Sequence, residues 1–437
     1  MNAASPNSQA NATPAPLSVA VLGCGSRGRT YSRLIAFCGE DYRLTAAADP
    51  VAVRREAVSS LGPAGQIRVF ASADELFSAG KLADVLIIAT QDSQHFGHAM
   101  RALELGYDIL LEKPAAESLA RCEEIDALAR RLGRRVALCF VLRYTPFYSE
   151  VKRIIDSGKL GKIISMRTHE GVEPFHQAHS FVRGHWSRSG TSTPMIVAKC
   201  SHDADLICWL GGAGLSSISS YGDLTWYHPG NAPTGAPLRC TDGCPASESC
   251  IYDSRRYLGD KRRWLGMVMD GFEQAADHEI LEMLKVSPWG RCVYHCDNDV
   301  VDHQVLACEL TNGITATHTM TSFDFGRGIE IYGTLASLKG GIPYSEAGAP
   351  ELWLRHHADG RIEPVDIPQP NNAGYAGHGG GDHGLVQALG SLFSGPERLE
   401  PGLDGLAGHR LAFLAEEARV TRRTIASSPA SALSPQS

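Results

Sequence analysis

Short apolar runs alternate with helix-length amphipathic segments over the first third of the chain. The segment 117–133 has acidic residues early, arginines late and a closing glycine, as expected for a helix. Five apolar runs have the length and character of strands buried on both faces, and these are 17–23, 43–49, 83–90, 107–113 and 134–140. Buried strands that alternate with helices predict a parallel, doubly wound sheet.

The pattern changes after residue 140. Residues 300–323 form two alternating runs around Asn312-Gly313, which is a strong hairpin signal. We therefore expect an α/β chain whose doubly wound domain is followed by an α+β domain with a large, mostly antiparallel open sheet. The expected divisions are a disordered tail at 1–16, the doubly wound domain at 17–140, the second domain at 141–427 with an irregular insertion at 228–270 and C-terminal helices at 383–426, and a disordered tail at 428–437.

A glycine-rich turn follows the first strand. It reads Gly23-Cys24-Gly25-Ser26-Arg27-Gly28 and fits GxGxxG between a strand and a helix pattern, and Asp49 ends the next strand. This context predicts a Rossmann dinucleotide site, where Gly23 and Gly25 let the backbone approach a pyrophosphate and the helix N-terminus binds it. Asp49 would accept hydrogen bonds from the ribose hydroxyls. An acid there favours NAD over NADP, although the nearby Arg54 and Arg55 weaken that preference.

The strand 107–113 ends in Lys113, which is followed by Pro114. Ligands of open α/β sheets bind beyond the carboxyl ends of the strands, so Lys113 points toward the cofactor. With GCGSRG and ATQDSQH (89–95), the run LLEKP (111–115) resembles the glucose–fructose oxidoreductase / inositol dehydrogenase family, Gfo/Idh/MocA. The resemblance covers about 17–212 and continues more loosely toward 427.

The resemblance implies a Rossmann domain joined to an open-sheet domain, and NAD(P)-dependent oxidation of a ring hydroxyl in a sugar or cyclitol, or the reverse reduction. It implies that Lys113 positions or deprotonates that hydroxyl, that His95 lies beside the cofactor, and that the Lys113–Pro114 bond is cis. The residues expected at the cofactor are Gly23, Gly25, Ser26, Arg27, Gly28, Asp49, Thr90, His95, Glu112 and Lys113.

The apolar segment 194–210 carries a polar stripe. If it is one helix, Lys199, His202 and Asp203 share a face. Members of the resembling family often carry Asp-x-x-x-His here, with the histidine as acid/base. His202 matches that histidine, but the aspartate position is Ala198. Either Asp203 or Asp205 then orients the imidazole, or Lys199 is used differently.

We assign His202 as the proton acceptor, Lys113 as its orienting partner and Lys199 as a third catalytic residue, with the reverse assignment of the first two left open. Histidine, arginine and aromatic side chains suit a polyhydroxylated ring. The side chains expected at the substrate are His179, Arg183, Trp186, Asp203 and His378, with Asp382 within reach of the site; surface loops are the alternative interpretation of 173–186 and 375–384.

The formal net charge is -7 and no basic block is present, which argues against nucleic acid or an anionic membrane as a partner. No apolar run reaches the roughly 18 residues needed to span a bilayer. The N-terminal segment lacks the features of a signal peptide, so we expect a cytoplasmic protein with free thiols. The cysteines at 240, 244 and 250, with those at 292 and 296, make a structural zinc ion the alternative, but no metal ligand is assigned.

The sequence thus predicts an NAD-dependent sugar or cyclitol dehydrogenase that forms a homodimer or homotetramer. One alternative is a hydrolase or lyase that uses NAD transiently, by oxidation, elimination and re-reduction. A second alternative is an NAD-binding sensor without turnover.

Overall fold

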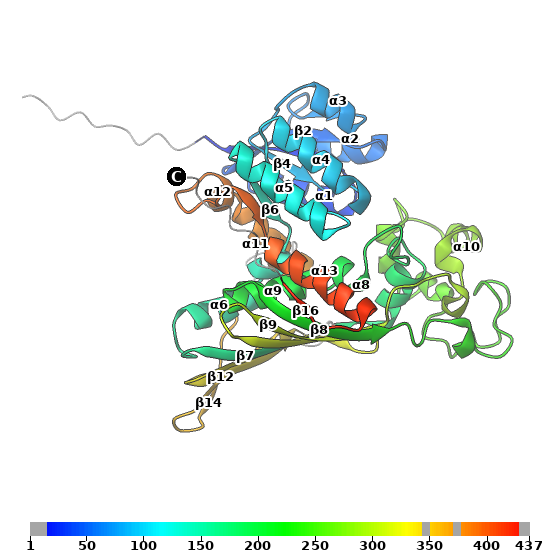
Figure 1. Ribbon diagram of the computed structural model, residues 1–437. Helices are drawn as coiled ribbons and strands as arrows, with labels where there is room; N and C mark the ends of the chain where they lie inside the picture. Colours follow the sequence, from blue (N-terminus) through cyan, green and yellow to red (C-terminus); the bar gives the residue numbers. More distant parts are fainter. Residues whose placement is uncertain (1–14, 343–349, 370–376, 428–437) are drawn as a thin grey trace, which may run out of the picture.

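The computed structural model describes residues 15–342, 350–369 and 377–427, so nearly all of both predicted tails lies outside the described residues. Two sheets organise the chain, one in the cofactor domain and one in the second domain (Figure 1). An irregular lobe lies beside the second sheet. This arrangement confirms the predicted fold class.

The first sheet is parallel and has the strand order β15-β6-β5-β4-β1-β2-β3. Its strands are β1 (Leu17–Leu22), β2 (Tyr42–Ala48), β3 (Arg68–Phe70), β4 (Val85–Ile88), β5 (Asp108–Leu111), β6 (Arg135–Leu138) and β15 (Gly402–Asp404). The helices that accompany it are α1 (Ser26–Phe37), α2 (Ala52–Ser59), α3 (Ala73–Ser78), α4 (Asp92–Glu104), α5 (Leu119–Leu132), α11 (Gly381–Gln387) and α12 (Leu389–Phe393). The five predicted strands are all present, each within a few residues of its expected bounds.

Local sequence signals set the ends of these helices. The Ser118 side chain caps α5 by accepting from the Arg121 N–H, and Gly133 ends the helix with a φ of 63°. The edge strand β15 was not expected. It comes from far along the chain and pairs parallel with β6, so the cofactor domain draws its seventh strand from beyond residue 400.

The second sheet has the order β14-β13-β12-β11-β7-β10-β9-β8-β16. The pair of β7 and β10 is parallel, and the other described pairs are antiparallel. The predicted hairpin is present, because β9 and β10 flank Gly313, whose φ is 83°. The strands are β7 (Ile163–Val172), β8 (Leu215–Asp223), β9 (His303–Leu310), β10 (Thr315–Thr321), β11 (Phe325–Gly333), β12 (Ala336–Ile342), β13 (Glu351–His356), β14 (Ile362–Pro364) and β16 (Ile425–Ala426).

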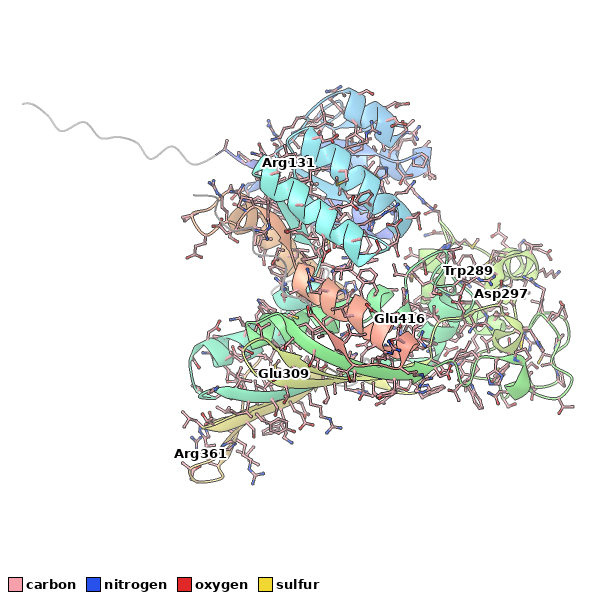
Figure 2. All side chains as sticks on the ribbon, viewed as in Figure 1. Arg131, Trp289, Asp297, Glu309, Arg361 and Glu416 are labelled. Carbon is pink, nitrogen blue, oxygen red and sulfur yellow. The ribbon has the colours of Figure 1, made fainter. Side chains whose placement is uncertain are left out.

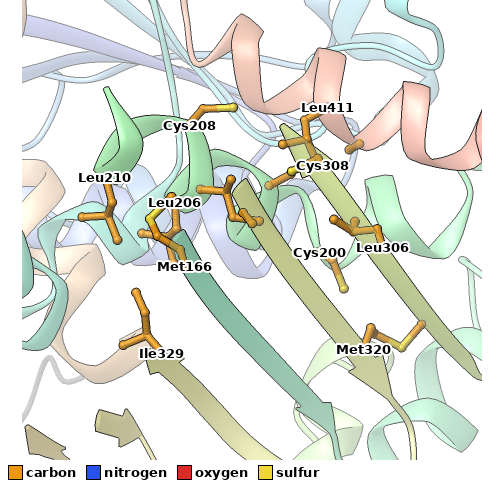
Figure 3. Close-up of a cluster of buried hydrophobic side chains, with 14 of the residues drawn as sticks. Met166, Cys200, Leu206, Cys208, Leu210, Leu306, Cys308, Met320, Ile329 and Leu411 are labelled. Atoms are coloured by element: carbon orange, nitrogen blue, oxygen red, sulfur yellow. The ribbon is translucent and has the colours of Figure 1, made fainter. Parts of the chain in front are cut away.

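Helices cover one face of the second sheet: α6 (Pro146–Asp156), α8 (Met195–Ala198), α9 (Ser201–Gly211) and α13 (Leu406–Thr421) (Figure 1). Leu206 and Leu210 of α9 and Leu411 of α13 pack there against Met166 and Leu306 of the sheet (Figure 3). Full burial of a leucine side chain stabilises a fold by about 1.5–3 kcal/mol. This core fixes α9, and with it the polar residues that α9 carries.

The lobe contains α7 (Pro174–His176), a π-helical segment at Gln177–Val182, and α10 (Asp277–Val286). Trp289 and Asp297 lie in it (Figure 2). Residues 228–270 contain short 3-10 segments and one isolated bridge, from Arg239 to Arg291. A search of the described helices finds none that is both long enough and apolar enough to cross a bilayer.

Candidate active site

The glycine turn leads from β1 into α1. A Cβ on Gly28 would lie 1.8 Å from the Gly23 oxygen, and one on Gly23 would lie 2.5 Å from the Ala89 oxygen. Gly25 has open space around it. The expectation that Gly23 admits a pyrophosphate therefore needs correction, because its missing side chain makes room for the chain at the end of β4. Gly25, which has open space around it, and the exposed Ser26 are the residues of the turn that a pyrophosphate could approach.

Asp49 lies at the end of β2 and braces this turn. Its carboxylate accepts from the backbone N–H of Cys24 and from that of Val51, both at 2.8 Å. The side chain is buried, so the turn and the acid form one unit. Each carboxylate oxygen keeps a further lone pair, so the predicted ribose contact stays a prediction.

Arg27 leaves the glycine turn and enters a buried ionic network. Its guanidinium binds Glu112 at 2.7 Å and Asp382 at 2.6 Å, and Tyr31 donates to Glu112 at 2.8 Å. Burial opposes the charged forms, but Arg27 holds the pKa of Glu112 below its usual value, and His378 and Arg27 do the same for Asp382. The network joins α1, β5 and α11.

His95 is buried between two loops rather than open to solvent. Its Nδ1 lies 2.7 Å from the Pro114 oxygen and its Nε2 lies 3.1 Å from the Thr90 oxygen. The Lys113–Pro114 bond is cis, as expected. Thr90 and His95 thus hold the loop that follows Lys113.

Lys113 extends from the carboxyl end of β5 toward the second domain. Its Nζ donates to the Ala198 oxygen at 2.7 Å. That oxygen is available because the expected helix 194–210 is broken into α8 and α9 at Lys199 and Cys200. Burial lowers the pKa of Lys113, although the negative charges of Glu112 and Asp92 act to raise it.

His202 lies next to Lys113, against the Phe140 ring, with ring centroids 5.7 Å apart. Its Nδ1 has no hydrogen-bond partner among the described residues. Burial lowers the pKa of His202 well below its usual value, and Lys113 and Arg327 lower it further. The imidazole is therefore neutral near pH 7 and can accept a proton.

Neither predicted aspartate orients His202. Asp203 pairs with Arg327, and Asp205 pairs with Arg143 at 2.5 Å. The idea of a replacement aspartate is therefore wrong, because buried arginines occupy both carboxylates. Asp203 is buried and pairs with Arg327, and its predicted contact with a substrate stays a prediction.

Lys199 lies in the break between α8 and α9. Its Nζ pairs with Glu170 at 2.7 Å, and Arg327 bonds the other Glu170 oxygen at 2.8 Å. Glu170 and Arg327 come from β7 and β11, and no local motif in the sequence distinguishes them. Alternation along the strand at 162–171 was the only available signal.

His378 faces His202 from the glycine-rich turn before α11. The two ring centroids are 6.5 Å apart, and the His378 Nδ1 lies 3.0 Å from Asp382. His378 has a φ of 50°, which strains a residue with a side chain. Strained residues gather at functional sites, so this geometry supports the prediction that His378 belongs here.

The other predicted substrate residues divide into two groups. Trp186 donates to Asp92 at 2.9 Å and links the lobe to the cofactor domain. His179 is buried against the Tyr257 hydroxyl, and Arg183 is buried on backbone oxygens of the lobe, so neither reaches Lys113. His176 lies nearer to Lys113 than these two residues do, because the charges of Lys199 and Lys113 add to burial in lowering its pKa. Its ring packs against Trp264, with ring centroids 4.6 Å apart.

Known proteins share sequence similarity with this chain. Residues 17–140 match the profile of the GFO_IDH_MocA family, an oxidoreductase family with an NAD-binding Rossmann fold. YteT of Bacillus subtilis, which is named as an oxidoreductase, is 26% identical over 77% of both chains. An inositol 2-dehydrogenase of Streptomyces avermitilis is 32% identical over 46% of this chain, a match that spans only 55% of that enzyme.

A solved NAD-binding oxidoreductase of Klebsiella pneumoniae has the same fold. The superposition has a TM-score of 0.68 over 95% of this chain and 100% of the other, at 17% identity. The agreement covers both sheets, so it extends beyond the cofactor domain. Over residues 17–140 the chain therefore resembles the Gfo/Idh/MocA family of oxidoreductases, and its fold over both domains is that of the solved neighbour.

Proposed function

We propose that this chain is an NAD-dependent dehydrogenase that transfers a hydride between a ring hydroxyl carbon of a sugar or cyclitol and nicotinamide. One observation carries the proposal. Lys113 extends from the carboxyl end of β5 to the Ala198 oxygen at 2.7 Å, four positions before His202, and its charge helps burial to lower the pKa of His202. A neutral imidazole near a lysine offers a proton acceptor and a hydrogen-bond donor to a substrate hydroxyl, as alcohol oxidation requires.

The two side chains take different parts in this reaction. The bound nicotinamide supplies the hydride acceptor. His202 accepts the hydroxyl proton, because its ring is already neutral. Lys113 is anchored on the Ala198 oxygen at 2.7 Å and retains two donors, with which it orients the hydroxyl. Lys199, held by Glu170, adds positive potential that stabilises the developing alkoxide.

NAD is the proposed cofactor in preference to NADP. The 2′-phosphate of NADP would lie close to the Asp49 carboxylate, which would repel it. The arginines that could offset this, Arg29 and Arg54, are both bonded to Asp270 of the lobe, at 3.4 and 2.9 Å. Arg55 donates to the Asp49 backbone oxygen instead. These contacts leave no described guanidinium without a partner at this corner.

A polyhydroxylated ring is the proposed substrate class. The name of the Streptomyces avermitilis relative supports a cyclitol. The His176 imidazole, which packs against Trp264, lies close enough to Lys199 and Lys113 for their charges to lower its pKa, and indole faces suit the C–H face of a sugar. We propose no nucleic acid or membrane partner.

A transient use of NAD is the second candidate. Elimination from an oxidised ring needs one group to remove a carbon-bound proton and another to protonate the leaving group. Four protonatable side chains lie near one another here, namely Lys113, Lys199, His202 and His378, which exceeds the need of a simple dehydrogenase. Ala198 also stands where members of the resembling family often carry an aspartate. This candidate predicts product without net NADH.

The test measures NADH absorbance and product in the same wells, with NAD and a panel of sugars, glycosides and inositols. His202→Asn and Lys113→Met are compared with His357→Asn, which changes an exposed histidine on the second domain. NADH growth that both site variants lose and the control keeps supports the dehydrogenase. Product without NADH contradicts it in favour of transient redox, and NAD binding with neither signal favours the sensor.

We propose that the open face of the second sheet pairs two copies into a homodimer or homotetramer. Tyr221, Val305 and Trp353 expose 55%, 43% and 42% of their surface on strands β8, β9 and β13. Large apolar side chains on a sheet face are typical of an interface. Sedimentation equilibrium of the wild type and of Val305→Lys tests this, since a single wild-type monomer contradicts it.

A reducing compartment such as the cytoplasm is the proposed location. All twelve cysteines lie within the described ranges, and none of them is in a disulfide bond. Thiols in such number persist where glutathione and thioredoxin keep them reduced. Fractionation of the native host, followed by immunoblotting, measures the location directly.

A further inference from the structure

Five cysteines from two distant segments meet in the lobe. Cys240, Cys244, Cys250 and Cys292 line one small cavity, which leaves about 10 Å³ for the centre of a water-sized sphere. Space of that size suits one atom rather than a cluster of several. Cys296 lies close by, with its thiol directed at the Cys292 oxygen at 3.3 Å.

The backbone brings these cysteines together. The Cys240 N–H donates to the Gly290 oxygen at 3.0 Å, and the Cys292 N–H donates to the Leu238 oxygen at 2.9 Å. This short antiparallel bridge sets Cys240 beside Cys292. Gly243, with a φ of 81°, then turns the chain back so that Cys244 faces the same cavity.

Arg183 supplies a second, independent observation. It is 3% exposed and also lines the cavity, and its guanidinium bonds two backbone oxygens and the Cys240 sulfur at 3.6 Å, with the neutral Tyr257 hydroxyl also in range. Its Nη1 has no partner among the described residues. Asp253 lines the same cavity, but Arg255 binds both of its oxygens. A buried permanent cation without an anion is costly, so Arg183 calls for negative charge on the sulfurs.

We propose that Cys240, Cys244, Cys250 and Cys292 bind one zinc ion as thiolates. Four thiols lose four protons when they take up Zn²⁺, so the complex carries a charge of about -2. Arg183 compensates part of that charge. Tetrahedral coordination by four sulfurs selects zinc or an iron–sulfur centre, and the small cavity favours the single ion.

The sulfurs would have to move to take up the ion. No three of these sulfurs lie within 4.8 Å of one another in the described chain, so zinc uptake would draw them inward.

A second group of potential ligands is less suited to a metal ion. Cys200, Asp203 and His318 place ligand atoms within 4.8 Å of one another beneath α9. Arg327 and Lys199 already balance the two carboxylates there, Asp203 and Glu170. A divalent ion with one thiolate would therefore add a buried positive charge. The cysteine cavity has the opposite imbalance, which is why we assign the ion there.

The zinc site would act on the substrate side of the active site through Arg183. Arg183 directly follows the π-helical segment Gln177–Val182, and that segment follows His176. A metal that fixes the guanidinium also fixes this segment. Loss of zinc should raise KM more than it lowers kcat.

The experiment begins with metal analysis of the full chain, expressed with zinc in the medium, by inductively coupled plasma mass spectrometry. We expect about one zinc per chain. On the folded wild type, titration of thiols with a mercurial should release the zinc to a chromogenic chelator. A protein that carries no stoichiometric metal, or carries iron, overturns the assignment whatever the variants do.

Two variants then identify the ligands. Cys240→Ser and Cys292→Ser should lower the zinc content to background, whereas Cys296→Ser should keep one ion. Equal zinc in all three variants, or loss in Cys296→Ser alone, contradicts the proposed ligand set. Cobalt substitution gives an independent readout, because thiolate-to-cobalt absorption should disappear in Cys240→Ser and remain in Cys296→Ser.

Discussion

Two ionic networks lie on either side of the catalytic pair. On the cofactor side Arg27 binds Glu112 and Asp382, and on the sheet side Glu170 binds Lys199 and Arg327. Between them Lys113 donates to a neutral carbonyl. The networks hold their charges by mutual pairing, whereas the pair between them can change protonation. The contrast separates groups whose charge is fixed by a partner, Lys199 among them, from the pair proposed to exchange the substrate proton.

Replacement of Lys113 should have the largest effect. Lys113→Met removes the hydroxyl donors but keeps the buried stem, so we expect kcat to fall by about 10²- to 10⁴-fold with the fold intact. NADH fluorescence titration should show cofactor binding within a few-fold of the wild type. Retained turnover in Lys113→Met would show that the lysine only builds the site.

Disruption of the sheet-side network should instead destabilise the fold. Arg327→Met leaves Asp203 and part of Glu170 unpaired and buried, which should lower the free energy of unfolding by about 3–5 kcal/mol. Urea denaturation followed by circular dichroism measures this. Arg361→Met breaks an exposed pair with Glu363 and should leave the urea midpoint nearly unchanged. Equal losses would contradict the distinction between buried and exposed pairs.

Acidification should weaken the loop behind Lys113. His409 accepts from the Ala115 N–H at 3.0 Å, and burial lowers its pKa to about 4. In the unfolded chain the pKa of His409 is about 6.5. Between about pH 4 and pH 6.5 the unfolded chain therefore binds the proton and the folded chain does not. The free energy of unfolding then falls as pH falls, by about 1.4 kcal/mol per pH unit. His409→Gln should flatten that slope in urea melts at pH 4.5–6.5. An unchanged slope, as expected for exposed His357→Gln, would exclude His409 as its source.

The smallest effect should appear at Asp270. Asp270→Asn frees Arg29 and Arg54, so the ratio of kcat/KM for NADP to that for NAD should rise by about two- to fivefold, as expected for an exposed pair worth under about 1 kcal/mol. Asp297→Asn is the matched control, because that exposed carboxylate also binds two arginines but lies elsewhere in the lobe (Figure 2). A fall in the ratio, or an equal rise in the control, would contradict the proposed role.

The sequence predicts the cofactor half well because its signals are local. The turn from Gly23 to Gly28 depends on neighbours a few residues apart and is present, and the same holds for one feature of the second sheet, the hairpin at Gly313. Strand β3 was missed because Arg68–Phe70 is too short to show a pattern. Strand β15 was missed for the same reason.

The substrate half is predicted less completely, because its partners are remote. Arg327 lies 124 positions from Asp203, and nothing in either segment identifies the other. The break at Lys199 was also missed, since 194–210 has an unbroken apolar pattern. Lys199 lies at the break between the two helices and pairs there with Glu170 on β7. A buried lysine needs such a partner, and the partner comes from a strand that the local sequence does not identify.

The pairing of β15 with β6 ties the cofactor domain to the order of protein synthesis. The first six strands of that sheet leave the ribosome early, but β6 lacks its outer neighbour until Gly402–Asp404 has emerged. An open strand edge is prone to pair with other chains. A nascent chain that stalls in the second domain therefore carries an unfinished first domain, and only a nearly complete chain can close it.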